Sequence, residues 1–195
     1  APAALLDAAQ AALIARLEKT AIGDPRDEAT RMGALVSVSQ RQDVRAKIRE
    51  IGADASIVYG DPDASPVNEK GAFLSPVLLR CERPGEARFV HDVEAFGPVS
   101  TLMPYRDAAD AIALANRGKG SLVMSAFTYD AGFARDLALG SGSFHGRLAF
   151  IDRDSAKEST GHGSPMPHMI PGGPGRARGG QEMGGGRRPA HYMQR

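Results

Sequence analysis

A carboxylate and a phenyl ring stand two residues apart in the stretch "VEAFGPV", at Glu94 and Phe96. A carboxylate can accept hydrogen bonds from the hydroxyls of a sugar, and an aromatic ring can pack against a flat heteroaromatic. Gly97 lets backbone or ligand approach closely, and Pro98 favours an extended path for the chain. The residues alone leave two interpretations open, because a solvated acid and a core phenylalanine would give the same pattern.

The elements around this segment predict an α/β fold with a mostly parallel sheet flanked by helices. Apolar residues at helical spacing indicate a helix over residues 1–20, and a second helix is expected over 37–53, capped by Ser37 or Ser39 and ended by Gly52. Glu94 and Phe96 fall in a loop that leads into a strand, where open α/β sheets usually bind ligands. The other expected elements are strands at 56–60, 73–81, 97–107, 121–130 and 145–152 and helices at 107–118 and 131–141, and their alternation is typical of parallel crossover units. Pro76 favours an edge position for the second strand.

The composition is that of a globular chain of 195 residues, with 42% hydrophobic and 24% charged residues and a net charge of +1. Cys81 is the single cysteine, which excludes an internal disulfide and fits a cytoplasmic setting. The five histidines are scattered without metal-ligand spacing, so we expect no bound metal. His91 and His145 are interpreted as structural or surface residues. No apolar run reaches the length of a membrane span, so we expect no membrane partner.

The C-terminal segment differs in composition from the rest of the chain. It is rich in glycine and proline, and residues 171–195 hold five arginines against the single acid Glu182. We therefore expect a globular part over 1–160 and a glycine-rich loop with the start of an oligomerisation segment over 161–195. An alternative function of another class is RNA binding by this arginine-glycine segment, although stacking aromatics are missing from it until Tyr192.

Three motifs together resemble the aldehyde dehydrogenase superfamily. "EAFGPV" is similar to its Glu-x-Phe-Gly-Pro signature, "IGDPRDEATRMGALVS" to its Gly-Asp-Pro and Met-Gly-Pro-Leu-Val segments, and "GGPGRARGGQEMGG" to its C-terminal glycine-rich segment. The motifs occur in the family's order and span most of the chain. The runs "SAKESTGHGSPMP" and "HYMQR" are most similar to the dehydrogenase half of bifunctional phenylacetic acid degradation proteins, which join an oxepin-CoA hydrolase to a semialdehyde dehydrogenase. The chain therefore resembles the C-terminal part of the family's catalytic domain.

The resemblance implies oxidation of an aldehyde with NAD or NADP as cofactor, and the similarity to the phenylacetic acid degradation proteins implies a CoA-linked semialdehyde. It assigns Glu94 to the nicotinamide ribose and Phe96 to the nicotinamide ring, and it brings His162 and Ser164 near the substrate entrance. The family's nucleophilic cysteine and general-base glutamate are expected upstream of Ala1, and Cys81 is expected to be a small core residue. The resemblance thus predicts that this chain alone is inactive and that its parent is a homo-oligomer without a nucleic-acid partner. A naturally truncated, non-catalytic relative that acts as an interaction module is the alternative.

Overall fold

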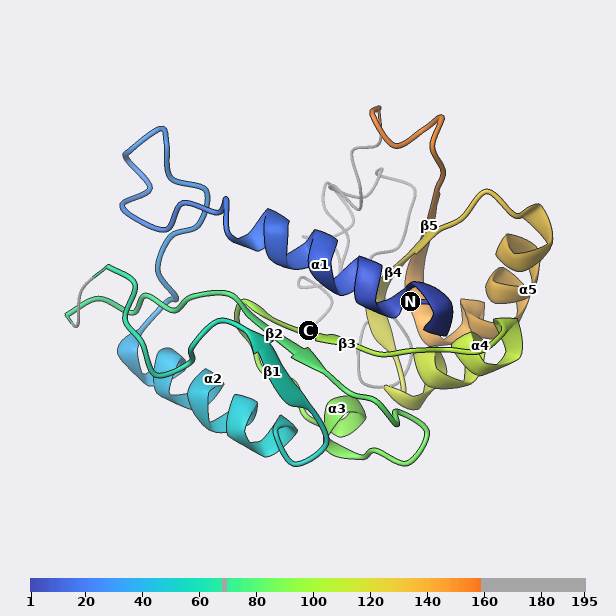
Figure 1. Cartoon of the computed structure of the whole chain (residues 1–195), viewed down its shortest axis with the longest axis horizontal. Helices are drawn as coiled ribbons and strands as arrows, with labels where there is room; N and C mark the ends of the chain where they lie inside the picture. Colours follow the sequence, from blue (N-terminus) through green and yellow to red (C-terminus); the bar gives the residue numbers. More distant parts are fainter. Residues whose placement is uncertain (68–69, 159–195) are drawn as a thin grey trace, which may run out of the picture. The chain divides into compact units, whose positions relative to one another are not determined.

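The computed structural model describes residues 1–67 and 70–158, and the chain divides into two compact units, Ala1–Arg106 and Asp107–Arg195 (Figure 1). The predicted glycine-rich segment 161–195 lies outside the described residues, so the proposed boundary at residue 160 stays a prediction. None of the helices in the described part of the chain is both long and apolar enough to cross a lipid bilayer.

The first unit is built on a three-stranded sheet with the order β1-β2-β3. The strands are β1 (Ser56–Tyr59), β2 (Val77–Arg80) and β3 (Val99–Leu102). β1 runs antiparallel to β2, whereas β2 and β3 are parallel and pair Val77 with Val99. The expected mostly parallel sheet is therefore wrong for this unit, which has a mixed sheet. The reason is the connection from β1 to β2: its described residues, 60–67 and 70–76, form no helix that would carry the chain back across the sheet, so the second strand returns beside the first in the opposite direction.

Pro76 does not place its strand at an edge, because β2 is the central strand of the sheet. The residue precedes the first paired residue, Val77, so its missing N–H is not needed in the ladder. Its carbonyl oxygen lies against Gly60, which has a φ of +85° and where a Cβ would stand 2.1 Å from that oxygen. Glycine is required at this position for both reasons.

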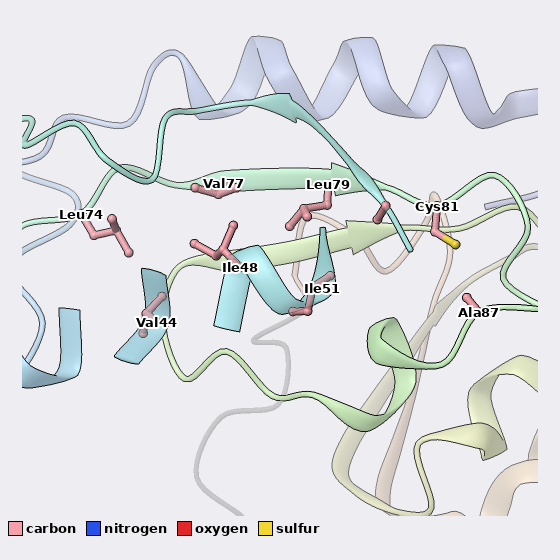
Figure 2. Packing of buried hydrophobic residues seen from close by; sticks show 9 residues of the cluster. Val44, Ile48, Ile51, Leu74, Val77, Leu79, Cys81 and Ala87 are labelled. Atoms are coloured by element: carbon pink, nitrogen blue, oxygen red, sulfur yellow. The ribbon is translucent and has the colours of Figure 1, made fainter. Parts of the chain in front are cut away.

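Two helices cover opposite faces of this sheet. α2 (Val38–Ile51) packs on one face, where its residues Val44, Ile48 and Ile51 meet Val77 and Leu79 of β2 in the main core (Figure 2). α1 (Leu6–Leu17), which follows the 3-10 turn η1 (Ala3–Leu5), covers the other face with a second cluster around Leu6, Leu78 and Leu102. β2 is therefore buried on both faces, which explains its uninterrupted run of apolar residues.

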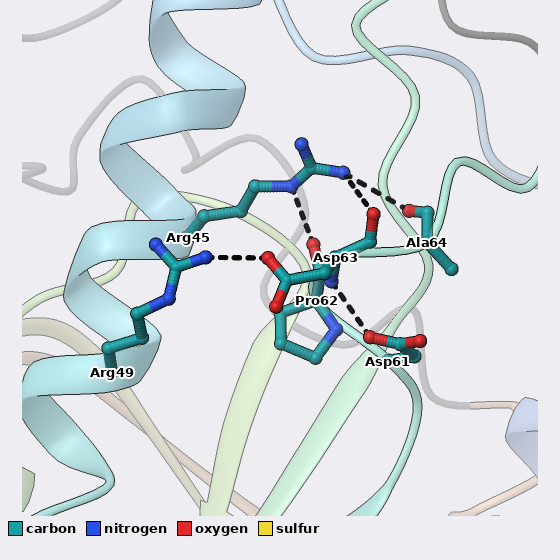
Figure 3. Close-up of polar contacts among 6 residues, drawn as sticks. All are labelled: Arg45, Arg49, Asp61, Pro62, Asp63 and Ala64. Carbon is teal, nitrogen blue, oxygen red and sulfur yellow. Dashed lines mark hydrogen bonds and ion pairs between the residues drawn. The ribbon is translucent and has the colours of Figure 1, made fainter.

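Polar contacts attach the helices to the strands and loops. Arg80, at the end of β2, donates to Asp7 Oδ1 at 2.5 Å and to Gln10 Oε1 at 2.9 Å, both on α1. Two arginines of α2 bind the loop that follows β1 (Figure 3). Arg45 donates to the carbonyl oxygens of Pro62 (2.6 Å), Asp63 (2.9 Å) and Ala64 (3.3 Å). Arg49 forms an ion pair with the Asp63 carboxylate at 2.6 Å. The loop after β1 is thus held along α2.

The second unit contains a parallel strand pair and its crossover helix. α4 (Ala108–Arg117) leads to β4 (Ser121–Phe127), α5 (Ala131–Ser141), the 3-10 turn η2 (Gly142–Phe144) and β5 (His145–Ile151). β4 and β5 pair in parallel from Ser121 opposite His145 to Phe127 opposite Ile151. α4 and α5 begin at the side-chain caps Asp107 and Asp130. Here the predicted strand-helix-strand crossover is confirmed.

Candidate functional site

The segment Val93–Val99 connects the short helix α3 (Phe89–Asp92) to β3 and projects two side chains outward. Burial alternates along it, because Val93 and Ala95 pack against the main core while Glu94 and Phe96 are exposed. Phe96 is 72% exposed, so the interpretation of this ring as a core residue is wrong. The side chains that could contact a ligand thus share the outer side of this segment.

Backbone hydrogen bonds fix the end of this segment. The Gly97 N–H donates to the Ala95 carbonyl at 2.7 Å, and the Val99 N–H donates to the Gly97 carbonyl at 2.8 Å, which makes two successive three-residue turns. The Pro98 carbonyl accepts from the Val77 N–H at 2.9 Å, directly before the parallel ladder of β2 and β3 begins. The turn is therefore continuous with the central sheet.

Helix α2 supports the same turn from below. The Gln40 side-chain amide donates to the Phe96 carbonyl at 2.8 Å. One turn further along the helix, Val44 lies directly against Gly97, where a Cβ would stand 2.9 Å from Val44 Cγ2 and 3.0 Å from Val44 Cγ1. Glycine is needed at position 97 because of this close approach. Its φ is not in the left-handed region, so backbone conformation does not require glycine there.

The start of α3 is fixed by a carboxylate from outside the helix. Asp54 Oδ2 accepts from the backbone N–H groups of Arg88 (2.8 Å), Phe89 and Val90 (3.3 Å). These are donors that a helix start leaves without intrahelical partners. Because α3 leads straight into Val93, this contact holds the other end of the candidate segment.

The site presents a carboxylate and an aromatic ring on a rigid support. Within residues 1–67 and 70–158, the Glu94 carboxylate makes no hydrogen bond or ion pair. Its oxygens are thus able to accept hydrogen bonds from hydroxyl groups, and the exposed face of Phe96 is able to pack on a flat ring. This arrangement fits a ligand that combines a sugar with a heteroaromatic ring.

Cys81 is a core residue, as predicted. Its side chain is 1% exposed within the main core, and burial raises the pKa of the thiol. A buried, protonated thiol is a poor nucleophile, because the thiolate is the reactive form.

The described histidines have structural surroundings. His91 Nε2 lies 2.9 Å from the Pro84 carbonyl oxygen, and His145 is buried at the start of β5, with Nδ1 2.6 Å from Ser121 Oγ. His162 and Ser164 lie outside the described residues, and their roles stay predictions. The part of the chain that the structure describes holds no cluster of three or more His, Cys, Asp or Glu residues able to bind a metal ion.

Sequence reasoning missed Gln40 and Asp54 as residues that support the site. Ser37 and Gln40 have the spacing of a capping box, in which the glutamine side chain would return to the Ser37 N–H. In the structure Ser37 Oγ does accept from the Gln40 N–H at 3.1 Å, but the Gln40 amide reaches Phe96 instead. The capping signal was visible in the sequence, whereas the distant partner was not.

Comparisons with known proteins show sequence similarity to aldehyde dehydrogenases. Residues 2–141 match the sequence model of the aldehyde dehydrogenase family. Protein MaoC of Klebsiella aerogenes is 48% identical over 165 residues, which are 84% of this chain and 49% of that protein. The 3,4-dehydroadipyl-CoA semialdehyde dehydrogenase of Aromatoleum evansii is 42% identical over 182 residues, which are 91% of this chain and 35% of that enzyme. The chain thus spans half or less of the length of these relatives.

Solved structures show the same fold. Betaine aldehyde dehydrogenase from Staphylococcus aureus, in complex with NAD+, superposes with a TM-score of 0.80 at 25% sequence identity. The match covers 98% of this chain and 36% of that enzyme. The mixed α/β architecture of this chain therefore corresponds to about a third of an enzyme that was solved with NAD+ bound.

Proposed function

The chain belongs to the aldehyde dehydrogenase family, and on that premise we propose that it is the C-terminal part of the catalytic domain of an NAD(P)-dependent semialdehyde dehydrogenase. The proposed substrate is a CoA-linked semialdehyde of phenylacetate-type aromatic catabolism, which is oxidised to the acid. The identity of 42% to 3,4-dehydroadipyl-CoA semialdehyde dehydrogenase supports a CoA-linked semialdehyde as the substrate.

Glu94 and Phe96 are the proposed cofactor contacts of this chain. The Glu94 carboxylate accepts hydrogen bonds from the nicotinamide-ribose hydroxyls, and the Phe96 ring packs near the nicotinamide. When bound, NAD(P) supplies the acceptor for the hydride that leaves the substrate. The observation that carries the proposal is the segment "EAFGP", which is similar to the family's Glu-x-Phe-Gly-Pro signature: Phe96 is exposed, and the Glu94 carboxylate makes no hydrogen bond or ion pair with any described residue.

The nucleophilic cysteine and the general-base glutamate are proposed to lie in sequence upstream of Ala1. Covalent catalysis of aldehyde oxidation requires an accessible thiolate beside the cofactor. Cys81 does not meet this requirement, because it is buried and its pKa is raised. The role of this chain is then to hold the nicotinamide end of the cofactor, while the reacting thiol is supplied by the preceding part of the protein.

The substitution Glu94→Gln tests the cofactor role in the full-length gene product. It keeps the shape of the side chain and removes the charge that strengthens its hydrogen bonds, so we expect the KM for NAD(P) to rise about tenfold. The matched control is Glu28→Gln, because Glu28 is exposed and its side chain makes no hydrogen bond or ion pair with any residue that the structure describes. A KM for NAD(P) that stays within about twofold of wild type in the Glu94 variant would refute the assignment.

A second measurement tests whether the nucleophile lies outside this chain, in the upstream sequence. Residues 1–195 alone, mixed with an aldehyde and NAD or NADP, are expected to produce no NADH or NADPH above background. Production of either would show that this chain carries its own nucleophile, contrary to the proposal.

A further inference from the structure

The turn that carries Phe96 rests on one face of helix α2. Gln40 and Val44 are four residues apart, a spacing that places them one above the other on the same side of a helix. Gln40 contacts the carbonyl of Phe96, and Val44 contacts the next residue, Gly97. Two successive positions of the helix face therefore support two successive residues of the cofactor segment.

The hydrogen bond from Gln40 holds the second end of the peptide group between Phe96 and Gly97. The Phe96 carbonyl and the Gly97 N–H belong to the same planar group, which moves as a unit. The N–H end donates to the Ala95 carbonyl at 2.7 Å, and the carbonyl end accepts from Gln40 Nε2 at 2.8 Å. With both ends held, the plane cannot rotate freely about its neighbouring bonds, and this restricts the direction in which the Phe96 side chain leaves the backbone.

The side chain of Gln40 does not cap its own helix. In a capping box it would return to the Ser37 N–H, whereas here it bonds to the Phe96 carbonyl, 56 positions away. The contact thus serves the turn rather than the start of α2.

We propose that Gln40 is a positioning residue for cofactor binding, which acts through the Phe96 carbonyl while Val44 supports Gly97 from below. This inference rests on the proposed function, because it assumes that Glu94 and Phe96 contact NAD(P). It assigns to α2 the task of holding the carboxylate and the ring in their binding orientation before the cofactor arrives. Such preorganisation improves affinity because less freedom is lost on binding.

The test compares Gln40→Ala with Gln42→Ala in the full-length gene product. Gln42 is the same residue type on the same helix, is exposed, and makes no hydrogen bond with any described residue. The first readout is hydrogen exchange of the Gly97 and Val99 amides, measured without cofactor. The second is the set of steady-state constants: the KM for NAD(P), the KM for the aldehyde, and kcat.

For Gln40→Ala we expect the Gly97 amide to exchange roughly fivefold faster and the KM for NAD(P) to rise roughly fivefold, the equivalent of one ordinary hydrogen bond. The KM for the aldehyde and kcat should stay within about twofold, and Gln42→Ala should match wild type in every readout. Unchanged exchange at Gly97 would overturn the inference outright. Faster exchange with an unchanged KM for NAD(P) would also overturn it, because the contact would then be only structural.

Failure of the proposed function has a different signature. In that case Glu94→Gln leaves the KM for NAD(P) unchanged, while the Gly97 amide still responds to Gln40→Ala. This result would confirm the contact between Gln40 and the turn and would refute its role in cofactor binding.

Discussion

The close approach of Gly97 to Val44 predicts a measurable coupling between substitutions at these two positions. In Gly97→Ala the new methyl would stand 2.9 and 3.0 Å from the two terminal carbons of Val44, so either the turn or the buried Val44 side chain must shift. Overpacking of this kind costs about 1–3 kcal/mol. Val44→Ala removes two methyl groups from a fully buried side chain, which costs about 2–3 kcal/mol at roughly 1–1.5 kcal/mol per methyl.

The double variant should be far more stable than the sum of these losses implies. Once Val44 is alanine, the nearest atom to the methyl at position 97 is the Cβ of residue 44, at an ordinary contact distance of 3.5 Å. It also fills part of the cavity that the valine leaves. We therefore expect the double variant to lose about 2–3 kcal/mol, close to the loss in Val44→Ala alone, which corresponds to a coupling energy of about 1–3 kcal/mol.

The single cysteine of the chain provides the assay. Cys81 lies in the same core as Val44, so its labelling by a maleimide pulse at increasing urea concentration reports the unfolding of this unit. The control is Gly33→Ala, since a Cβ at Gly33 meets no atom within 4 Å and its stability should stay within about 0.5 kcal/mol of wild type. Additivity of the two single losses within about 0.5 kcal/mol would refute the argument that Val44 and Gly97 are in direct contact.

Two further predictions follow from the buried titratable groups. Without urea, Cys81 should react with thiol reagents at least about a hundredfold more slowly than a free thiol, because it is buried and its pKa is raised; rapid labelling would contradict its place in the core. The pKa of His145 is lowered by burial, so the unfolded chain takes up a proton near pH 6.5 before the folded one does. Stability should therefore fall as the pH drops below about 6.5 and level off below the folded pKa. In urea titrations His145→Asn should lose this dependence, and a variant that keeps it would show that another group is responsible.

The sequence was sufficient for elements whose signals are local. Ser37 and Gly52 lie at the two ends of α2, as expected from their capping chemistry, and the parallel pair in the second unit follows from the alternation of strands and helices. The position of Glu94 and Phe96 in a loop before a strand was also predictable, because Gly97 and Pro98 interrupt any regular element there.

Elements that depend on distant partners were not predictable. α3 has only four residues, too few for a sequence pattern, and it is fixed by the carboxylate of Asp54 from more than thirty positions away. The antiparallel pairing of β1 with β2 depends on the course of a long connecting loop, and part of that loop is held by arginines of α2. The exposure of Phe96 had no local signal either, because a phenylalanine in such a segment is equally suited to a core.

The two ends of the first unit meet at one point, which has a mechanical consequence. Pro2 and Tyr105 form a parallel bridge, in which the Ala3 N–H donates to the Tyr105 carbonyl at 2.8 Å and the Tyr105 N–H to the Ala1 carbonyl at 3.0 Å. Because the bridge is parallel, residues 1 and 106 lie at opposite ends of the paired stretch, so a pulling force applied there would shear these few bonds together rather than break them one after another. The same closure allows the unit to be grafted into a host loop or circularly permuted, because a short linker can join its ends without stretching the fold.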